Sequence, residues 1–498
     1  MRKITAIVLA FLLILSSCKN SEDPAGNSSE IASGDNRTSS LQSLSIPYIE
    51  NDSFNPYTVY SSVNIAVIPL LYDSLVVVNN SFEAEYSVAE KIERTSATAL
   101  TVTIKDNIFF SDSNKMNAAD VVFSFQNCKT KGSYYPEKLS GISGATASGD
   151  RTVVFTLSAP DRYIENCLDF PITEKIAGID NPVGSGRYTL SSNGDAPVLK
   201  ANQNHFKVSD YTFDTVTCVA IPDNDSLFYA IKTGMVNIIP ADLSLGTYMG
   251  SFCLTKNVST GNFVYLGVSE NGIMAEPPVR KYISACLDRS VIVSSGSSLA
   301  STETSLPLFP KIGEVFELNL NKTVKDTAAI EALKAEPSIT FGDGGKLHYN
   351  SQKVTVKLLY SEDSSEKKAF ASTIAAQLSA AGIETELVGK NYSGFLSSVA
   401  AKDFDLYIGE IKLTNSLSFS SLFDSAKFGL SVSPEIRASY TSFCSGETKT
   451  ADFLNTFNKS LPLIPIMFKS STVAYSKNIV STVIPMVSDS YFSLQNLE

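Results

Sequence analysis

Short apolar runs alternate with helical stretches along most of the chain, from residue 43 to its end. Within 98–110, Leu100, Val102 and Ile104 occupy every second position, which is the period of a strand with one buried face. Comparable runs predict further strands at 43–49, 151–157, 212–221, 263–268 and 353–361.

Helical periodicity is clearest in residues 366–388, where four apolar side chains fall on one face. Gly382 is expected to end that helix, and a strand over 384–388 follows it. The face consists of Phe370, Ile374, Leu378 and Ala381. Further helices are predicted within 61–78 and 226–239, after Asn117 as N-cap, and over 277–293 with proline near the start. This succession of strands and helices predicts α/β domains with mixed sheets.

The first 18 residues have the pattern of a bacterial lipoprotein signal. Arg2 and Lys3 precede an apolar stretch, 4–15, that is too short to span a membrane comfortably. Leu15-Ser16-Ser17-Cys18 resembles the lipobox, which implies that residues 1–17 are a signal peptide and that Cys18 is diacylated. An ordinary secretory signal and a short uncleaved anchor are the alternatives. The polar residues 18–42 are predicted to form a lipidated, flexible tether.

The composition fits a large exported protein and excludes nucleic acid as a partner. The chain has 498 residues, 43% of them hydrophobic, which is enough for two or three domains. A net charge of −11 and a pI near 5.0 leave no basic surface that would neutralise phosphates.

Metal and catalytic motifs are absent from the sequence. It has no CxxC pair and two histidines, His205 and His348, which are interpreted as surface residues. It also lacks a G-x-S-x-G elbow, an H-E-x-x-H helix and a P-loop, so an enzyme is not expected. Six cysteines remain besides Cys18, and two interpretations stay open. They are buried thiols, or they form bridges such as Cys128–Cys167 and Cys218–Cys253.

Eight blocks of sequence resemble, in order, those of the bacterial extracellular solute-binding proteins of family 5, which serve oligopeptide, dipeptide and nickel ABC importers. The block at 101–125, TVTIKDNIFFSDSNKMNAADVVFSF, carries the resemblance most clearly, with its Ser-Asp and Ala-Asp-Val-Val-Phe-Ser motifs. The other blocks are LYDSLVVVN (71–79), GDRTVVFTLSAP (149–160), PVGSGRYTL (182–190), PDNDSLFYAIKTGMVNI (222–238), PPVRKYISACLDRSVI (277–292), FDLYIGE (404–410) and LPLIPIMF (461–468).

The resemblance implies a two-lobed, type II periplasmic-binding-protein-like fold with an extra subdomain inserted in lobe one. Two chain crossings, near Tyr265 and near Phe468, would connect the lobes. Lobe one would comprise 43–75, 173–262 and 470–498, the insertion 76–172, and lobe two 263–469.

The implied function is capture of a small ligand, an oligopeptide or dipeptide in most relatives, and its delivery to the permease of an ABC importer. The resemblance implies a monomer without a cofactor, held by its lipid at the extracytoplasmic side of the membrane. A sensor of a peptide signal and a binder of a nickel chelate or another small solute are the alternatives.

Three segments of the resembling family contact the ligand. Their counterparts here are Tyr60, Ser61 and Ser62; Tyr265 and Ser269; and Gly409, Glu410, Lys412 and Thr414. The third segment departs from the family's Gly-Trp-x-x-Asp-Tyr, because it has neither the Trp nor the Asp that binds a peptide amino terminus. Glu410 is either a substitute anion or part of a solvated pair with Lys412 on one side of a strand. Ser269 stands where the family often has Asn, so both departures leave peptide specificity open.

Overall fold

The computed structural model describes residues 43–194, 196–207, 211–242, 252–296, 300–424 and 426–497. The predicted signal peptide, the lipidated Cys18 and the predicted tether over 18–42 lie outside these residues. Within the described ranges, no helix is long and apolar enough to cross a membrane.

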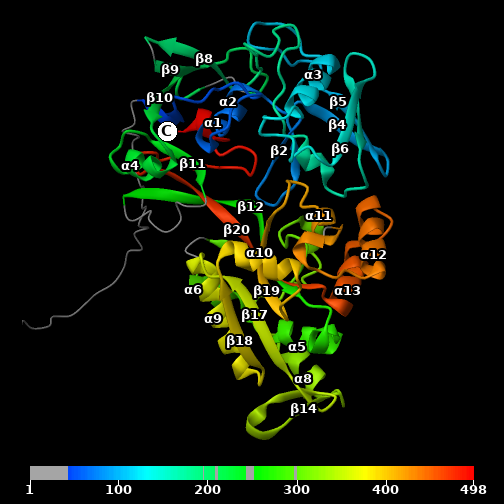
Figure 1. Ribbon diagram of the computed structural model, residues 1–498. Coiled ribbons are helices and arrows are strands. Elements are labelled where there is room, and N and C mark those ends of the chain that lie inside the picture. The colour runs from blue at the N-terminus through cyan, green and yellow to red at the C-terminus, as the bar shows by residue number, and fades with distance from the viewer. Residues whose placement is uncertain are drawn as a thin grey trace, which may run out of the picture. The chain divides into compact units, whose positions relative to one another are not determined.

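A four-stranded sheet contains the first predicted strand. Its strand β1 pairs in parallel with β10, and the other neighbours are antiparallel (Figure 1). Leu44 and Ile46 of β1 are buried against α1 and α2, so the apolar run at 43–49 forms the expected buried strand. In order across the sheet, the strands are β1 (Leu44–Ile49), β10 (Thr215–Ile221), β9 (Ala196–Ala201) and β8 (Tyr188–Asn193); the two short helices are α1 (Ser62–Ile65) and α2 (Ile68–Leu71).

A second, antiparallel sheet packs against helix α3 (Ala118–Cys128). The alternating Leu100, Val102 and Ile104 are all buried in it, as their period predicts. Asn117 caps α3 as expected: its side chain accepts from the Ala119 amide, and Asp120 accepts from the Asn117 amide. The strands, in order across the sheet, are β4 (Ala89–Ser96), β5 (Ala99–Ile104), β7 (Thr152–Leu157) and β6 (Ile142–Ala147), and the hairpin β2 (Val76–Val78) and β3 (Ala84–Tyr86) precedes them.

The largest sheet is mixed and includes two long antiparallel strands, β12 and β20. Helix α9 (Ser365–Ala380) links the parallel strands β17 and β18. Phe370, Ile374 and Leu378 of its predicted apolar face are buried, whereas Ala381 is the C-cap and only half-buried. The strands, in order, are β11 (Ile238–Asp242), β20 (Leu463–Ser476), β12 (Cys253–Val268), β19 (Leu406–Lys412), β17 (Thr355–Ser361) and β18 (Glu384–Lys390), with β13 (Ser301–Glu303) paired to β20. The predicted α/β class with mixed sheets is confirmed.

The register of β12 on β20 shifts between Ser259 and Phe263. Before the shift β12 pairs only with β20, and after it β12 also pairs with β19. Phe263 lies opposite Phe468, so the two predicted crossings are adjacent in the sheet. The lobe boundaries themselves remain a prediction.

The predicted helix over 277–293 is wrong in one respect, because it is two helices, α5 (Pro277–Cys286) and α6 (Arg289–Gly296). Leu287 is extended between them, and the carboxylate of Asp288 accepts a hydrogen bond from the Val291 amide at 3.0 Å. Asp288 therefore starts a new helix instead of continuing the first.

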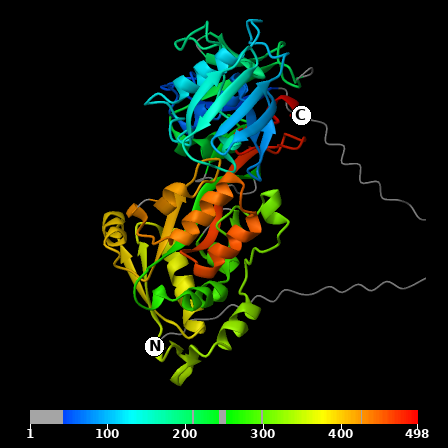
Figure 2. The same cartoon turned by 90° about the vertical axis from the view of Figure 1, so that its right-hand side faces the viewer.

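The remaining elements complete the packing around the largest sheet. Helices α12 and α13, drawn in orange, lie side by side in both views (Figures 1 and 2). The remaining elements of the chain are α4 (Leu227–Lys232), α7 (Gly313–Phe316), α8 (Thr327–Lys334), β14 (Ile339–Phe341), β15 (Leu347–Tyr349), β16 (Gln352–Lys353), α10 (Tyr392–Ala400), α11 (Ser420–Asp424), α12 (Pro434–Ser445) and α13 (Thr450–Ser460).

The cysteines follow the thiol interpretation. Cys128, Cys167 and Cys218 are buried free thiols, so neither of the two suggested bridges is present. Cys286 and Cys444 are also free and buried, and burial raises the pKa of the Cys286 thiol to about 11. These thiols pack as small apolar side chains.

Candidate functional site

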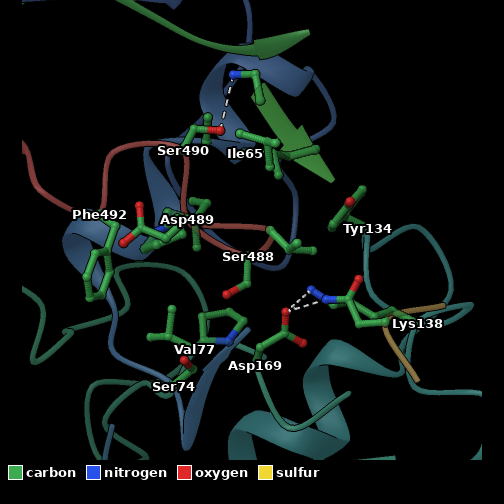
Figure 3. Close-up of a pocket in the computed structure, with 18 of the residues that line it drawn as sticks. Ile65, Ser74, Val77, Tyr134, Lys138, Asp169, Ser488, Asp489, Ser490 and Phe492 are labelled. Atoms are coloured by element: carbon green, nitrogen blue, oxygen red, sulfur yellow. Dashed lines mark hydrogen bonds and ion pairs between the residues drawn. The ribbon is translucent and has the colours of Figure 1, made fainter. Parts of the chain in front are cut away.

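A cavity of about 920 Å³ lies where the shift in β12 meets the end of β19. Its lining comes from segments that are far apart in the sequence, and both polar and apolar side chains border it (Figure 3). Ligand pockets typically measure about 300–1,000 Å³, so this one has room for a ligand much larger than a single ion. The main lining segments are 62–77, 134–138, 169–171, 258–261, 412–415 and 487–496.

Gly261 brings the segment 412–415 close to β12. The Leu413 amide donates to the Gly261 carbonyl at 2.9 Å, immediately after Lys412 pairs with Asn262 in the ladder. A Cβ on residue 261 would lie 2.5 Å from the Leu413 carbonyl oxygen, closer than atoms can approach. Glycine at this position therefore allows Lys412 and Thr414 to border the cavity.

A buried carboxylate holds the same segment from the other side. Asp169 Oδ2 accepts from Asn415 Nδ2 at 2.8 Å and forms an ion pair with Lys138 Nζ at 2.6 Å (Figure 3). Burial alone would lower the pKa of Lys138, but the charge of Asp169, its hydrogen bond to Lys138 and the influence of Tyr134 together outweigh burial and raise that pKa. Asp169 Oδ1 is also buried and has no hydrogen-bond partner among the described residues.

Lys412 contributes a second cation to the cavity. Its side chain keeps accessible surface because it borders the cavity, although protein atoms surround it. Loss of bulk water around the ammonium and the charge of Lys138 lower the pKa of Lys412 to about 8. Lys412 is therefore still mostly protonated at neutral pH.

The C-terminal segment borders another part of the cavity through Ser488 and Ser490 (Figure 3). The hydroxyl of Ser488 accepts from the Val78 amide at 2.8 Å, and that of Ser490 accepts from the Ala241 amide at 3.2 Å. Close by in the chain, the carboxylate of Asp489 pairs with the buried guanidinium of Arg187. These contacts fix the segment to three distant parts of the chain.

His205 corrects the interpretation that both histidines are surface residues. It is only 8% exposed, it borders the cavity, and its Nε2 lies 3.4 Å from Asp73 Oδ1. Asp73 also accepts from the Ser185 hydroxyl at 2.9 Å. The side chain of Asn202 donates to the carbonyls of Ser185 and Gly186, which holds the polar turn at 202–206 so that His205 lies beside Asp73 in the cavity wall.

Three of the nine residues expected to contact a ligand border the cavity: Ser62, Lys412 and Thr414. Tyr60 and Ser61 do not: Tyr60 is 66% exposed, and Ser61 caps α1 while donating to Asp52 Oδ2 at 2.6 Å.

Tyr265, Ser269 and Gly409 are buried away from the cavity. The Tyr265 hydroxyl is 3.1 Å from that of Tyr407, and its ring lies against Gly409, where a Cβ would be 2.5 Å from a ring carbon. Ser269 accepts from the Asn271 amide at 3.2 Å. In this structure Tyr265 and Gly409 pack within the largest sheet, and Ser269 directly follows its strand β12.

Glu410 also lies outside the cavity lining and instead belongs to a charge cluster. Its Oε2 pairs with Lys367 Nζ at 2.5 Å and with Lys469 Nζ at 3.0 Å, and Glu366 also pairs with Lys469 at 2.7 Å. Burial alone would raise the pKa of Glu410, but the two ammonium groups outweigh it and lower that pKa to about 2.

Sequence reasoning missed Lys138, Asp169, His205 and the serines at 488 and 490. The lipobox and the family blocks gave no signal for them, since each lies in a turn or loop without a motif. A buried charged pair such as Lys138–Asp169 is recognisable only once the fold brings its partners together. Within the described part of the chain, no group of three or more His, Cys, Asp or Glu side chains is placed to hold a metal ion.

Comparison with known proteins identifies relatives over nearly the whole chain. Residues 83–425 match the family described as bacterial extracellular solute-binding proteins, family 5 Middle. The oligopeptide-binding protein AppA of Bacillus subtilis (strain 168) is 26% identical over 434 residues, covering 80% of this chain and 78% of AppA.

Solved structures of other binding proteins have the same fold. The periplasmic murein tripeptide-binding protein MppA, in its unliganded open form, superposes with a TM-score of 0.72 at 17% identity, covering 90% of this chain and 96% of MppA. NikA from Brucella suis, in complex with Fe(III)-EDTA, gives a TM-score of 0.63 at 17% identity, covering 91% of this chain and 99% of NikA. The fold class and the family expected from the sequence are therefore confirmed.

Proposed function

The chain belongs to the bacterial extracellular solute-binding proteins of family 5, and we propose that it captures an oligopeptide or dipeptide in the cavity described above. Delivery to the membrane permease of an ABC importer, with Cys18 as the lipid anchor, completes the proposal. The observation that carries it is the 920 Å³ cavity beside the paired strands β12 and β20. The name of AppA as an oligopeptide-binding protein supports the choice of ligand class.

The lining suits a binding function because it offers many polar groups on a fixed frame. Residues 258–261 and 412–415 border the cavity together with Ser62 and Ser488. A few such groups in a partly apolar pocket orient a ligand without reacting with it. Of the nine residues expected from the sequence, we propose Ser62, Lys412 and Thr414 as ligand contacts.

Capture without chemistry is part of the proposal. Among the residues bordering the cavity, His205 is the one histidine, and its neighbour is Asp73 at 3.4 Å. No hydrogen bond joins a described serine of the cavity to this histidine. Ser488 and Ser490 accept from backbone amides, and the hydroxyls of Ser74, Ser259 and Ser471 donate to backbone carbonyls. The arrangement does not resemble a nucleophile with its base and orienting acid.

A thermal-shift screen of the purified full-length chain tests the proposal. The pools are peptides of two to eight residues, single amino acids, oligosaccharides and nickel chelates. A ligand that binds only the folded protein stabilises it by about 2.7 kcal/mol at a hundredfold excess over its dissociation constant. We expect peptides to raise the melting temperature and to be recovered intact. A shift with another class alone, or conversion of a pool member, would overturn peptide capture.

A further inference from the structure

The ammonium group of Lys412 has an unusual position for a partly enclosed cation. The backbone of Lys412 is fixed by its pairing with Asn262 and by the next hydrogen bond along the strand, from the Leu413 amide to the Gly261 carbonyl. The side chain of Lys412 therefore borders the cavity. Within the described ranges, no carboxylate or carbonyl lies within hydrogen-bonding distance of its Nζ. The charge that acts on it is that of Lys138, which is also positive.

Three other lysines near this sheet have a carboxylate partner. Lys367 and Lys469 share Glu410, and Lys138 pairs with Asp169. Enclosing a charge costs free energy unless an opposite charge or strong hydrogen bonds compensate it. Lys412 has no such partner among the described residues, and its side chain is exposed to the cavity.

Among the described residues, no carboxylate of the cavity is paired with Lys412. Asp169 Oδ2 is shared by Lys138 and Asn415, Asp489 pairs with Arg187, and Asp73 accepts from Ser185. Glu137, the neighbour of Lys138 in the chain, is exposed. Beside Lys412, the Thr414 hydroxyl is 3.0 Å from that of Ser416 and also borders the cavity. Lys412 and Thr414 thus border one cavity together with Lys138, whose charge acts on Lys412.

We propose that Lys412, together with Lys138, forms a subsite that binds a carboxylate of the ligand. The inference rests on the proposed function and narrows it to ligands that carry an ionised carboxylate at this end. The carboxylate has two possible sources in a peptide, the free carboxyl terminus and an acidic side chain. In either case Lys412 supplies the positive charge, and neither of the residues that follow it in the chain, Leu413 and Thr414, is acidic.

The test is isothermal titration of the purified full-length chain with matched peptide pools. One pool has tri- and tetrapeptides with free carboxyl termini, and a second has the same peptides as carboxyl-terminal amides. A third and a fourth pool are amidated and differ only in carrying glutamate or glutamine. The variants are Lys412→Gln and Lys412→Arg, and Lys353→Gln is the matched control. Lys353 pairs with Glu384 at 2.6 Å and lies outside the cavity lining.

Removing the charge at 412 should weaken binding of carboxylate-bearing peptides by about 10–100-fold, as expected for a hydrogen bond between charged groups. Lys412→Arg should bind within about threefold of the wild type, and Lys353→Gln should not differ from it. If Lys412→Gln no longer weakens binding when the peptides are amidated, the carboxylate that Lys412 binds is the carboxyl terminus. If glutamate in an amidated peptide restores the weakening, the carboxylate is that of the acidic side chain. Without ligand, Lys412→Gln should melt no lower than the wild type, because no partner loses a contact.

Two results would overturn the inference, and they are distinguishable. If Lys412→Gln and the wild type bind every carboxylate-bearing pool with equal affinity, the proposed subsite is refuted and peptide capture is not. If the wild type binds none of the four pools, both the proposed subsite and the proposed peptide capture are refuted.

Discussion

The substitution Glu410→Gln tests whether Glu410 belongs to a structural charge cluster or contacts the ligand. Glu410 accepts from Lys367 and Lys469, and its Oε1 also accepts from Asn262 Nδ2 at 3.2 Å. Glutamine keeps the shape of the side chain but leaves two enclosed ammonium groups with Glu366 as their remaining carboxylate. We therefore expect a loss of stability without a loss of ligand affinity.

The magnitude follows from the pKa of Glu410, which falls from 4.5 to about 2 in the folded chain. A decrease of about 2.5 units corresponds to at most about 3.4 kcal/mol of stabilisation when the carboxylate is ionised. Because the side chain is still 25% exposed and Glu366 partly compensates, we expect about 2 kcal/mol at pH 7.

The dependence on pH has a definite sign. A carboxylate with a lowered pKa stabilises the fold above its unfolded pKa and loses that contribution as the pH falls through its folded pKa. The difference between wild type and Glu410→Gln should therefore be full at pH 7 and smaller by up to about 0.8 kcal/mol at pH 4.

The assay is urea unfolding followed by circular dichroism, since the chain has no tryptophan. Glu384→Gln is the control, because Glu384 forms an exposed pair with Lys353 and its loss should change stability too little to measure. A difference for Glu410→Gln that is below about 0.5 kcal/mol at pH 7, or that grows as the pH falls, would refute the reasoning.

Three further predictions concern the cavity frame. Asp489→Asn should lower the free energy of unfolding by about 3–5 kcal/mol, because the buried Arg187 loses its carboxylate; calorimetry showing under about 1 kcal/mol would contradict this. Gly261→Ala should weaken ligand binding at least tenfold by displacing Leu413 and the residues beside it, and titration with unchanged affinity would exclude that role. Affinity for carboxylate-bearing peptides should be steady up to about pH 7 and fall about tenfold by pH 9, because Lys412 loses its proton near its pKa of about 8. An affinity that does not change between about pH 7 and pH 9 would count against a charged Lys412 contact.

Much of the fold follows from local sequence patterns. Buried strands such as β5 and the helix α9 could be predicted because their apolar residues repeat with the period of the element. The break at Leu287 was missed because an apolar stripe continues across it, although Asp288 is a good N-cap residue. Periodicity describes which face is buried and not where one helix ends and the next begins.

The cavity could be predicted only in part. Ser62, Lys412 and Thr414 followed from segments of the family resemblance, whereas Glu410 and Tyr265 in those same segments face other parts of the sheet. Alternation along a strand does not tell which neighbour a long side chain reaches. Partners separated by about 250 residues, as in Asn415 with Asp169, become visible only in the folded chain.

The most direct test of ligand capture is titration calorimetry of the full-length chain with the peptide pools, using a variant that fills the cavity. Ser62 borders the cavity, so Ser62→Trp should obstruct it, whereas Ser393→Trp places the same side chain on the exposed surface of α10. We predict one peptide bound per chain, at least tenfold weaker binding by Ser62→Trp, and unchanged binding by Ser393→Trp. Binding that is absent in the wild type, or equally strong in Ser62→Trp, would contradict capture in this cavity.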